Sequence, residues 1–370
     1  SIRQTDGAGG FPITRIETIA DRTINREKFG YAGIYDLAQY RDYILQDGDI
    51  LMSHINSEKH LGKVALYSKQ DDEQIIHGMN LLMLRADTQK VIPEYAKYYF
   101  ESQKFLRQIG RITKKSVNQA SFTVTALKEL EIPLASIIVQ RDISEKLKKV
   151  DWLVSLRKQQ IAKLDELVKA RFVEMFGDIS NDKKVLMEEV CKIITDGTHQ
   201  PPKFVLSGIP FLFVSNIVTN EIHYDAEKFI SEETYNELIK RTPIEVGDIL
   251  LSTVGSYGHP AIVRKNKPFC FQRHIAYLKP NSSVINGEYL RCAILSADVQ
   301  RQIDERVKGI AQKTLNLSEI RKIQIPLPPL SLQNQFAAFV ERVNQQKQTV
   351  QQSLEKLKLM KKALMQEYFG

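Results

Sequence analysis

Residues 143–176 read ISEKLKKVDWLVSLRKQQIAKLDELVKARFVEMF, a charged stretch that carries a narrow apolar stripe. From Ile143 to Val168 every position reached by alternating steps of four and three residues is apolar except Arg157. This spacing is typical of a long helix that packs against a second helix in a coiled coil. Gly177 follows the last periodic residue, where glycine favours the end of a helix. The stretch predicts a helix of about 34 residues, which is roughly 50 Å long and needs a partner.

The partner is encoded 193 residues further along the chain, because residues 116–177 align without a gap with residues 309–370. Ile132-Pro133-Leu134 corresponds to Ile325-Pro326-Leu327, and Phe176-Gly177 corresponds to Phe369-Gly370. The residues that we expect in the seam between the two helices are Ile143, Leu147, Val150, Val154, Ile161, Leu164 and Val168 in the first, and Phe336, Val340, Val343, Val350, Leu354, Leu357 and Leu364 in the second.

The repetition extends upstream with small gaps, since Gly48-Asp49-Ile50-Leu51 corresponds to Gly247-Asp248-Ile249-Leu250. The chain is therefore two copies of one unit, each a globular head followed by a charged helix. These copies are far longer than the units of a solenoid. Residues 180–198 have no counterpart in the first copy, which predicts that its opening strand or two is absent.

Connectivity makes the two helices antiparallel, because the first leads away from head one and the second must return toward it. The product is a pair of heads related by an approximate two-fold axis, as in a fused dimer, and held apart by a two-helix spacer. The alternative is that each helix packs only on its own head, which a narrow stripe favours less than a broad apolar face would.

Composition agrees with two domains in 370 residues. Apolar residues make up 43% and charged residues 26%, the mix of a globular protein rather than a disordered one. The net charge of +8 permits a polyanionic partner without requiring one. No apolar run reaches the length of a membrane span, so we expect no membrane contact. Three separated cysteines, with no signal peptide, indicate idle thiols and a cytoplasmic location.

Each head is predicted to be α+β. Strands are expected at 50–53, 63–67 and 80–85 in the first copy, and at 211–215, 249–252, 261–264 and 275–279 in the second. One helix is expected after the strands of each copy, over 94–109 and 288–306.

No catalytic or metal-binding constellation emerges from the heads. The chain contains neither a phosphate-binding loop nor the Asn-Pro-Pro-Tyr type of methyltransferase motif. The spacing of His54, His60 and His77 does not match that of a zinc site. We therefore expect no enzyme activity, no metal and no cofactor bound by this chain.

The heads offer polar and basic loops instead, in which Arg suits guanine edges, Asn and Gln suit adenine edges, and Lys suits phosphates. A solvated loop without a ligand is the ordinary alternative for each. The candidate DNA-binding residues of the first copy are Thr14, Arg15, His54, Asn56, Lys63, His77, Asn80, Lys114, Lys115 and Gln119. Those of the second copy are Thr198, His199, Gln200, Ser256, Tyr257, His259, Gln272, Arg273, Gln312 and Lys313.

Several stretches together resemble the specificity subunit of type I restriction-modification systems. They include Ile-Thr-Asp-Gly-Thr-His at 194–199, Gly-Ile-Pro-Phe-Leu at 208–212 and Gly-Asp-Ile-Leu at 247–250. Ile-Gln-Ile-Pro-Leu-Pro-Pro-Leu at 323–330, followed by the long helix, resembles the repeat region of that family.

The resemblance implies four segments. Residues 1–133 form a first target recognition domain that is incomplete at its N-terminus, and 134–178 form a central helical repeat. Residues 179–326 form a second target recognition domain, and 327–370 form a C-terminal helical repeat. Ala135-Ser136 departs from the pattern, because Pro328-Pro329 stands at this point in the second copy.

The resemblance also implies a non-catalytic subunit. Each recognition domain reads one half of a bipartite target in double-stranded DNA, and the helices set the half-site separation and dock two methyltransferase subunits. Those subunits carry S-adenosylmethionine, and restriction subunits in the same complex use ATP and Mg²⁺. The alternative within this class is a stand-alone DNA-binding or scaffold protein of a related methyltransferase system. The rivals outside it are a nuclease with a degenerate acidic site and a scaffold whose heads bind proteins.

Overall fold

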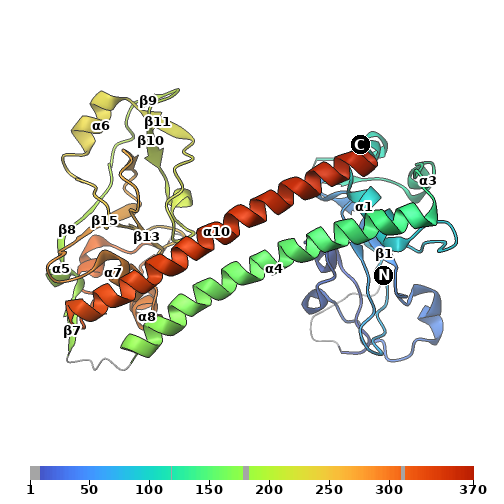
Figure 1. The fold of residues 1–370 in the computed structure, drawn as a ribbon, viewed down its shortest axis with the longest axis horizontal. Helices are drawn as coiled ribbons and strands as arrows, with labels where there is room; N and C mark the ends of the chain where they lie inside the picture. The colour runs from blue at the N-terminus through green and yellow to red at the C-terminus, as the bar shows by residue number, and fades with distance from the viewer. Residues whose placement is uncertain (1–8, 118, 178–182, 310–312) are drawn as a thin grey trace. The chain divides into compact units, whose positions relative to one another are not determined.

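The computed structural model describes residues 9–117, 119–177, 183–309 and 313–370 (Figure 1). The chain divides into two compact units. Unit 1 comprises Ser1–Lys158 with Gln352–Gly370, and unit 2 comprises Gln159–Gln351. Each unit thus contains a head together with one part of each long helix. No helix among the described residues is long and apolar enough to cross a membrane.

Unit 1 is built on a three-stranded antiparallel sheet in the order β3-β1-β4. Its strands are β1 (Ile50–Ser53), β3 (Val64–Leu66) and β4 (Leu81–Leu84). Helices α1 (Pro93–Glu101) and α2 (Gln103–Ile112) follow them. A small second sheet has the order β2-β6-β5, and α3 leads from it toward the long helix; these elements are β2 (Ile55–Asn56), β5 (Lys114–Lys115), β6 (Ala120–Ser121) and α3 (Val124–Lys128).

Unit 2 has a four-stranded antiparallel sheet in the order β13-β12-β15-β8. Its strands are β8 (Cys191–Asp196), β12 (Ile249–Ser252), β13 (Pro260–Ile262) and β15 (Ile275–Pro280), and helices α7 (Gly287–Ile294), α8 (Ala297–Arg306) and α9 (Leu317–Arg321) follow them. A second sheet, β14-β10-β11-β9, is formed by β9 (Phe204–Val205), β10 (Ile209–Leu212), β11 (Lys228–Ile230) and β14 (Cys270–Phe271), with α6 (Glu232–Leu238) after β11. A separate two-stranded sheet is formed by β7 (Lys184–Leu186) and β16 (Gln324–Pro326). Helix α5 (Met187–Val190) connects β7 to β8.

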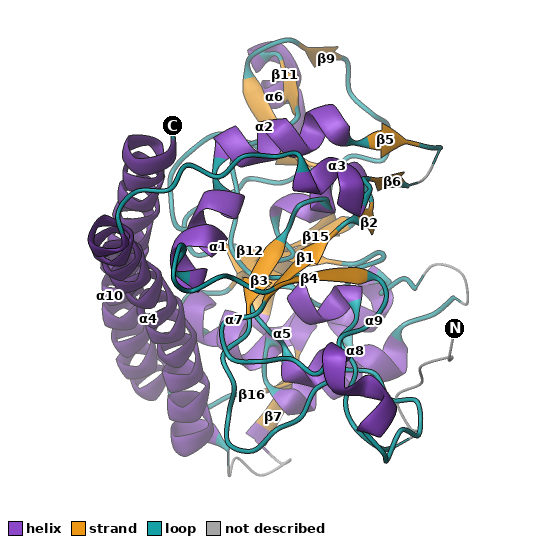
Figure 2. Cartoon of the chain, turned by 90° about the vertical axis from the view of Figure 1, so that its right-hand side faces the viewer, coloured by secondary structure: helices purple, strands orange, loops and turns teal. Residues whose placement is uncertain are grey.

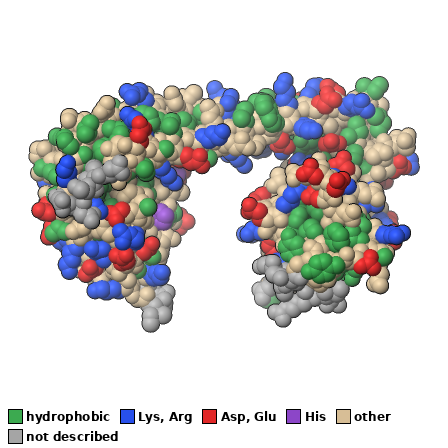
Figure 3. Space-filling view, turned by 90° about the horizontal axis from the view of Figure 1, so that it is seen from below, with side chains coloured by type: hydrophobic (Ala, Val, Ile, Leu, Met, Phe, Trp, Pro, Cys, Tyr) green, Lys and Arg blue, Asp and Glu red, His purple; other side chains and the backbone are tan. Residues whose placement is uncertain are grey.

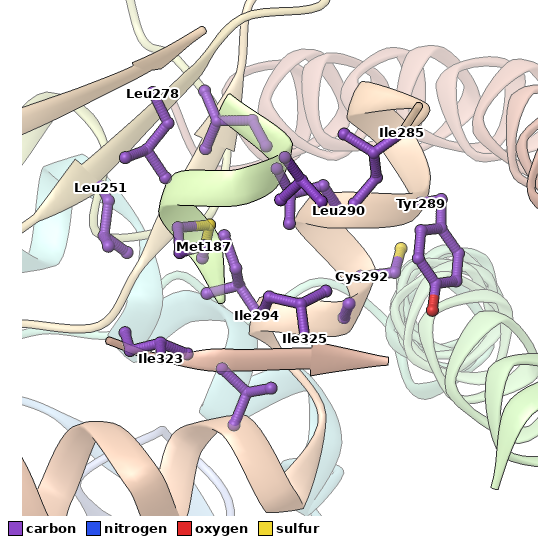
Figure 4. Packing of buried hydrophobic residues seen from close by; sticks show 14 of the residues in the cluster. Met187, Leu251, Leu278, Ile285, Tyr289, Leu290, Cys292, Ile294, Ile323 and Ile325 are labelled. Carbon is purple, nitrogen blue, oxygen red and sulfur yellow. The ribbon is translucent and has the colours of Figure 1, made fainter. Parts of the chain in front are cut away.

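Both central strands are buried along their whole length, β1 in unit 1 and β12 in unit 2. In unit 2, Leu251 and Leu278 of the sheet pack in one apolar cluster with Leu290 and Ile294 of α7 (Figure 4). A strand that is covered on both faces needs a continuous apolar run rather than an alternating one. This requirement explains why the sequence repeats Ile-Leu at the centre of each copy.

Each central strand is preceded by a buried aspartate whose carboxylate accepts several hydrogen bonds. Asp49 accepts two hydrogen bonds from Arg85, each 2.7 Å long, and Asp248 accepts one of 2.7 Å from the hydroxyl of Tyr277. Asp49 Oδ2 and Asp248 Oδ2 also accept the backbone N–H three residues earlier, at 2.7 and 2.8 Å. The repeated Gly-Asp turn is therefore closed by its own carboxylate, which fixes the point where each strand begins.

The α+β class of the heads is confirmed, whereas the single helix expected after each set of strands is wrong. The chain breaks into two helices at Ser102 in unit 1 and at Leu295 and Ser296 in unit 2. Ser102 and Ser296 both have extended backbone, and each hydroxyl accepts the N–H of the third residue in the next helix. Both serines are therefore N-caps, which begin a new helix in a new direction. The apolar periodicity of the sequence continues across each cap, so it predicted one helix where there are two.

Two long helices, α4 (Ile137–Phe176) and α10 (Leu330–Phe369), each contain 40 residues. Within each unit their segments lie side by side and run in opposite directions (Figures 1 and 2). Arg157 Nε lies 3.2 Å from Ser353 Oγ in unit 1, and Lys347 Nζ lies 2.7 Å from Asp165 Oδ1 in unit 2. The predicted pairing of the two helices is confirmed. All fourteen residues expected in the seam are buried or half-buried.

The C-terminal end of each long helix packs on the head in its unit. Phe369 lies edge-on to Tyr95 and Tyr99 in unit 1, at ring separations of 5.2 and 5.9 Å. Phe176 lies edge-on to Tyr289 and Phe336 in unit 2, at 4.9 and 5.5 Å. Each head therefore holds the end of the helix that follows the other head.

The two copies differ in the polar groups beside these aromatic contacts. In unit 1, Asp151 of α4 accepts hydrogen bonds from Tyr98 at 3.0 Å and pairs with Lys361 at 2.6 Å and Lys97 at 3.7 Å. In unit 2 the positions equivalent to Asp151 and Lys361 are Asn344 and Val168. The amide nitrogen of Asn344 is buried with no hydrogen-bond partner among the described residues. An ionic attachment in one copy is therefore absent from the other.

We expect Asp151→Asn to lower the free energy of unfolding by about 1–2 kcal/mol, because Lys97 and Lys361 share the carboxylates of Asp151 and Glu101 and the substitution leaves them only Glu101. Chemical denaturation of the full chain measures the change. Asp142→Asn on the same helix is the control, since among the described residues Asp142 forms an ion pair with the exposed Lys146 alone and its loss costs less than about 0.5 kcal/mol. Equal effects of the two substitutions would contradict the structural role of Asp151.

Candidate nucleic-acid interface

In unit 2 the polar loops gather at one end of the central sheet. Strands β8 and β12 end at Asp196 and Ser252, while β13 and β15 begin at Pro260 and Ile275. Because neighbouring strands in this sheet are antiparallel, these four points share one edge. We call the loops that extend from this edge the strand-end surface of unit 2, comprising residues 197–200, 253–259 and 272–274.

Two of these loops are joined directly by backbone hydrogen bonds. Thr198 and Gln272 form a parallel bridge, and the N–H of Arg273 donates to the carbonyl of Thr198 at 3.1 Å. Gln200 and Arg273 are exposed, and the Arg273 guanidinium lies 3.3 Å from the ring of His274. Residues that are 75 positions apart in the sequence thus form one polar ridge.

His199 is exposed, and its ring Nε2 lies 2.9 Å from Asp196 Oδ2. The same carboxylate accepts a hydrogen bond of 2.6 Å from Arg241. Sequence reasoning missed Arg241, because it lies in a different segment with no motif around it. Its position beside His199 adds a cation to the strand-end surface, partly neutralised by Asp196.

The loop between β12 and β13 lies next to this ridge, because the N–H of Thr253 donates to the carbonyl of His274 at 3.0 Å. Ser256 and Lys313 are exposed, and Lys313 Nζ lies 5.9 Å from the ring centre of Tyr257. The Tyr257 hydroxyl donates to Asp304 at 3.0 Å. The hydrogen bond to Asp304 holds the Tyr257 ring in place, and the ring face attracts the exposed ammonium group of Lys313.

The two remaining predicted residues of unit 2 are His259, at the end of the β12–β13 loop, and Gln312. The His259 ring Nδ1 lies 3.3 Å from Asn220 Oδ1, so the ring is engaged by the 219–221 segment. Gln312 lies outside the described residues.

Unit 1 presents the equivalent surface, where β1 ends at Ser53 and where β3 and β4 begin. Asn80 is exposed, and Lys63 is half-buried with its Nζ donating to the carbonyl of Ala20 at 2.8 Å. Lys63 and Asn56 line a small cavity of about 200 Å³ together with Ser53 and His60. The side-chain oxygen of Asn56 accepts the N–H of Ser57 at 2.7 Å, which closes the turn that leads out of this cavity.

A basic hairpin stands beside this surface, formed by β5 and β6. Lys114, Lys115 and Gln119 are exposed on it, and Lys115 pairs with Glu58 at 2.7 Å. The N–H of Ser116 donates to the carbonyl of Gln119 at 2.8 Å, which closes the turn. The hairpin places two lysines and an amide on one short, exposed element.

His54 and His77 contribute ring edges rather than positive charge. Burial lowers the pKa of both imidazoles, so both are neutral at pH 7. The His54 ring packs edge-on against Phe122 at 6.3 Å. A neutral imidazole remains able to donate or accept one hydrogen bond.

Thr14 does not belong to an exposed surface, which corrects the sequence-based expectation. It is buried, with 1% of its surface exposed, and its hydroxyl accepts the N–H of Gly78 at 2.8 Å. The residue therefore holds the 77–80 loop in place. Arg15, next to it, is half-buried.

On one face of the molecule, positive and negative side chains are interspersed. On the face drawn in Figure 3, Lys and Arg side chains alternate with Asp and Glu over both units. Among the described residues no group of three or more His, Cys, Asp or Glu side chains could hold a metal ion. The cysteines are free, and burial raises the pKa of Cys270 to about 12, which keeps its thiol protonated and unreactive.

The family described as type I restriction modification DNA specificity domain matches residues 4–166 and again residues 183–359. A putative type I restriction enzyme MjaX specificity subunit from Methanocaldococcus jannaschii is 32% identical, with 96% of this chain and 85% of that protein covered. The type I restriction enzyme EcoBI specificity subunit from Escherichia coli is 23% identical, covering 63% of this chain and 56% of that protein.

Solved structures show the same fold. The S subunit of a type I restriction-modification system from M. genitalium matches with a TM-score of 0.58 and 15% identity, over 99% of this chain and 90% of its own. A chain from a study of assembly and conformational transition of the type I R-M system matches with a TM-score of 0.55 and 18% identity, over 100% and 94%.

Lys313 adjoins the strand-end surface of unit 2, since its carbonyl accepts the N–H of Gly255 at 3.1 Å. If this surface contacts DNA, Lys313→Gln should make the negative slope of log affinity against log salt less steep by about one, because one phosphate contact fewer releases one counterion fewer. Lys265→Gln is the matched control, because it removes the same charge from the β13–β14 turn at the opposite edge of the sheet. Titration of duplex DNA at several salt concentrations measures both. A slope that Lys313→Gln leaves unchanged would place DNA elsewhere.

Proposed function

Because this chain belongs to the type I restriction modification DNA specificity family, we propose that it reads a bipartite target in double-stranded DNA for a methylation and restriction complex. It carries two recognition domains of that family. In the proposed role each domain reads one half-site, and the bases between the half-sites are not read. Neither methylation nor cleavage is performed by this chain.

The observation that carries the proposal is the repetition of one arrangement in two units. In each unit an antiparallel sheet with a buried central strand has polar loops at one edge. Exposed Lys, Asn and Gln side chains occur there in unit 1, and exposed Lys, Gln and Arg side chains in unit 2. Such side chains suit the edges of bases and the phosphates of the backbone. The loops differ between the units, as two half-sites of different sequence require.

We further propose that the paired long helices set the distance between half-sites. A helix of 40 residues is about 60 Å long. B-DNA completes one turn in about 34 Å, so a reader built on such helices suits half-sites that are separated by more than one turn. The seam residues and the cross-helix pairs Arg157–Ser353 and Lys347–Asp165 support a stiff spacer.

In the proposed complex two methyltransferase subunits supply S-adenosylmethionine, and restriction subunits supply the ATP- and Mg²⁺-dependent steps. The second candidate is a stand-alone DNA-binding or scaffold protein of a related methyltransferase system, which has the same fold but no catalytic partner. Co-expression with a methyltransferase subunit of a type I system from the same organism, followed by sequencing of methylated DNA, separates the two. We expect one bipartite methylated motif; the absence of any motif would favour the second candidate.

Lengthening both helices tests the spacer directly. Duplication of residues 154–160 in α4 and 351–357 in α10 adds one heptad to each helix at facing positions and keeps the seam in register. This adds about 10 Å, which corresponds to about three base pairs. Sequencing of methylated DNA should show both half-sites unchanged and their spacing increased. An unchanged spacing in a folded, active variant would contradict the ruler role.

Exposed apolar side chains on the helices support docking of a partner subunit there. Trp152 and Leu156 lie one turn apart on α4 and are 61% and 38% exposed. Large apolar side chains on a helix surface are typical of interfaces, and Trp is enriched there. In unit 2 a groove of about 940 Å³ adjoins α4, with Phe172, Val173 and Lys169 among its lining residues. We propose that the methyltransferase subunits contact these helix surfaces.

Trp152→Ala should weaken association with the methyltransferase subunit about tenfold or more, because a buried interface Trp typically contributes about 2 kcal/mol or more. Co-purification and titration calorimetry measure this. Tyr35→Ala is the control, since it removes another aromatic side chain, 75% exposed, from a head of the same unit. Equal weakening by both variants would argue against a helix-centred interface.

A further inference from the structure

A buried glutamine ties the start of α4 to the head of unit 1. Gln140 is fully buried in the first turn of the helix. Its side-chain oxygen accepts the N–H of Ile92 at 2.9 Å, and its nitrogen donates to the carbonyls of Lys90 at 2.9 Å and Ala135 at 2.8 Å. Ile92 is the residue before α1 and Lys90 lies in the loop ahead of it. One side chain thus joins three backbone groups from two separate segments.

The same arrangement recurs in unit 2 at the equivalent residue. Gln333 is fully buried near the start of α10. Its oxygen accepts the N–H of Asn286 at 2.8 Å, and its nitrogen donates to the carbonyls of Val284 at 3.3 Å and Pro328 at 2.8 Å. Asn286 is the N-cap of α7, which occupies the place of α1 in the second copy.

This repetition is informative because the surroundings of the two glutamines differ. Ala135-Ser136 precedes the first and Pro328-Pro329 the second. Further along the helices, the ion pair between Asp151 and Lys361 in unit 1 is replaced by Asn344 and Val168 in unit 2. Both glutamines nevertheless accept one hydrogen bond and donate two to equivalent backbone groups. A side chain that only filled space would not need to keep this set of hydrogen bonds. Hydrogen bonds have a direction, so three of them fix an angle as well as a distance.

We infer that Gln140 and Gln333 are positioning residues that fix the angle at which each recognition domain leaves its long helix, and that they thereby set how strictly the protein selects the spacing between half-sites. The inference rests on the proposed function. Both residues are buried and out of reach of DNA, so each acts through the head that it orients.

The geometry of DNA makes the angle important. One added base pair moves a half-site by about 3.4 Å and rotates it by roughly a tenth of a turn about the duplex axis. A head that is held rigidly cannot follow this rotation, so a site with the wrong spacing loses base contacts in one half. A head released from its clamp tilts at lower cost, and the penalty for the wrong spacing falls.

The test replaces each glutamine by methionine, which keeps the length and removes the hydrogen bonds. Methylation by the complete complex is measured on duplexes that carry the half-sites at the native spacing and at one base pair more and less. We expect Gln140→Met and Gln333→Met each to raise methylation of the misspaced sites, relative to the native site, about fivefold or more, the factor expected for loss of a net hydrogen bond. The preferred bases within each half-site should not change.

Ser144→Ala is the matched control, because Ser144 is also buried in α4 but donates only to the carbonyl of Gln140 within the helix, at 2.7 Å. It should leave the ratio of misspaced to native methylation unchanged. If either methionine variant fails to fold, Gln140→Asn and Gln333→Asn carry the same test, because the shorter amide cannot reach all three groups.

Methylation that falls equally at all spacings would show a structural role alone and would overturn the inference. Altered base preference within a half-site would also overturn it, since the clamp would then act on the reading surface. If the unmodified complex shows no bipartite methylation at all, the proposed function fails first, and this outcome is distinct from an unchanged spacing ratio.

Discussion

The fold depends on the apolar seam between α4 and α10. Most helical stability in proteins comes from packing of an apolar face, and in each of these 40-residue helices the apolar stripe is buried or half-buried against the other helix. Antiparallel pairing then places the start of one helix and the end of the other in the same unit, so that the heads are tied to the seam at both helix ends. Phe176 and Phe369 complete these contacts from the distal end of each helix.

The attachment of each head uses two kinds of interaction with different physical properties. Aromatic packing of Phe369 on Tyr95, and of Phe176 on Tyr289, supplies burial and tolerates small rotations. The hydroxyls of Tyr95 and Tyr289 add a directional bond, since they donate to the carbonyls of Pro133 and Pro326 at 3.0 and 2.7 Å. These two prolines are the centres of the repeated Ile-Pro-Leu motif. The motif thus marks the joint between head and helix.

Much of this fold could be predicted from the sequence because the same apolar patterns and turn motifs occur at equivalent positions in both copies. The apolar spacing from Ile143 to Leu164 and the repeated Gly-Asp-Ile-Leu located the helices and central strands. The break at Ser102 escaped prediction, since a capping serine does not interrupt an apolar pattern. Arg241 escaped because tertiary folding alone brings it to Asp196. Thr14 was misplaced because a polar residue next to arginine reads as surface, although its hydroxyl is used to hold the 77–80 loop.

The two copies share the residues that attach each head to its long helix and differ in the loops at the edge of the central sheet. Equivalent residues are retained where head meets helix, at Gln140 and Gln333 and at Tyr95 and Tyr289, and at the Asp49 and Asp248 turns that begin the central strands. Directly beyond those strands the sequences diverge, with His54-Ile55-Asn56 in one copy and Thr253-Val254-Gly255 in the other. A duplication used only for stability would gain nothing from this contrast. The contrast agrees with the proposed function, in which the two heads attach to their helices in the same way but read different bases.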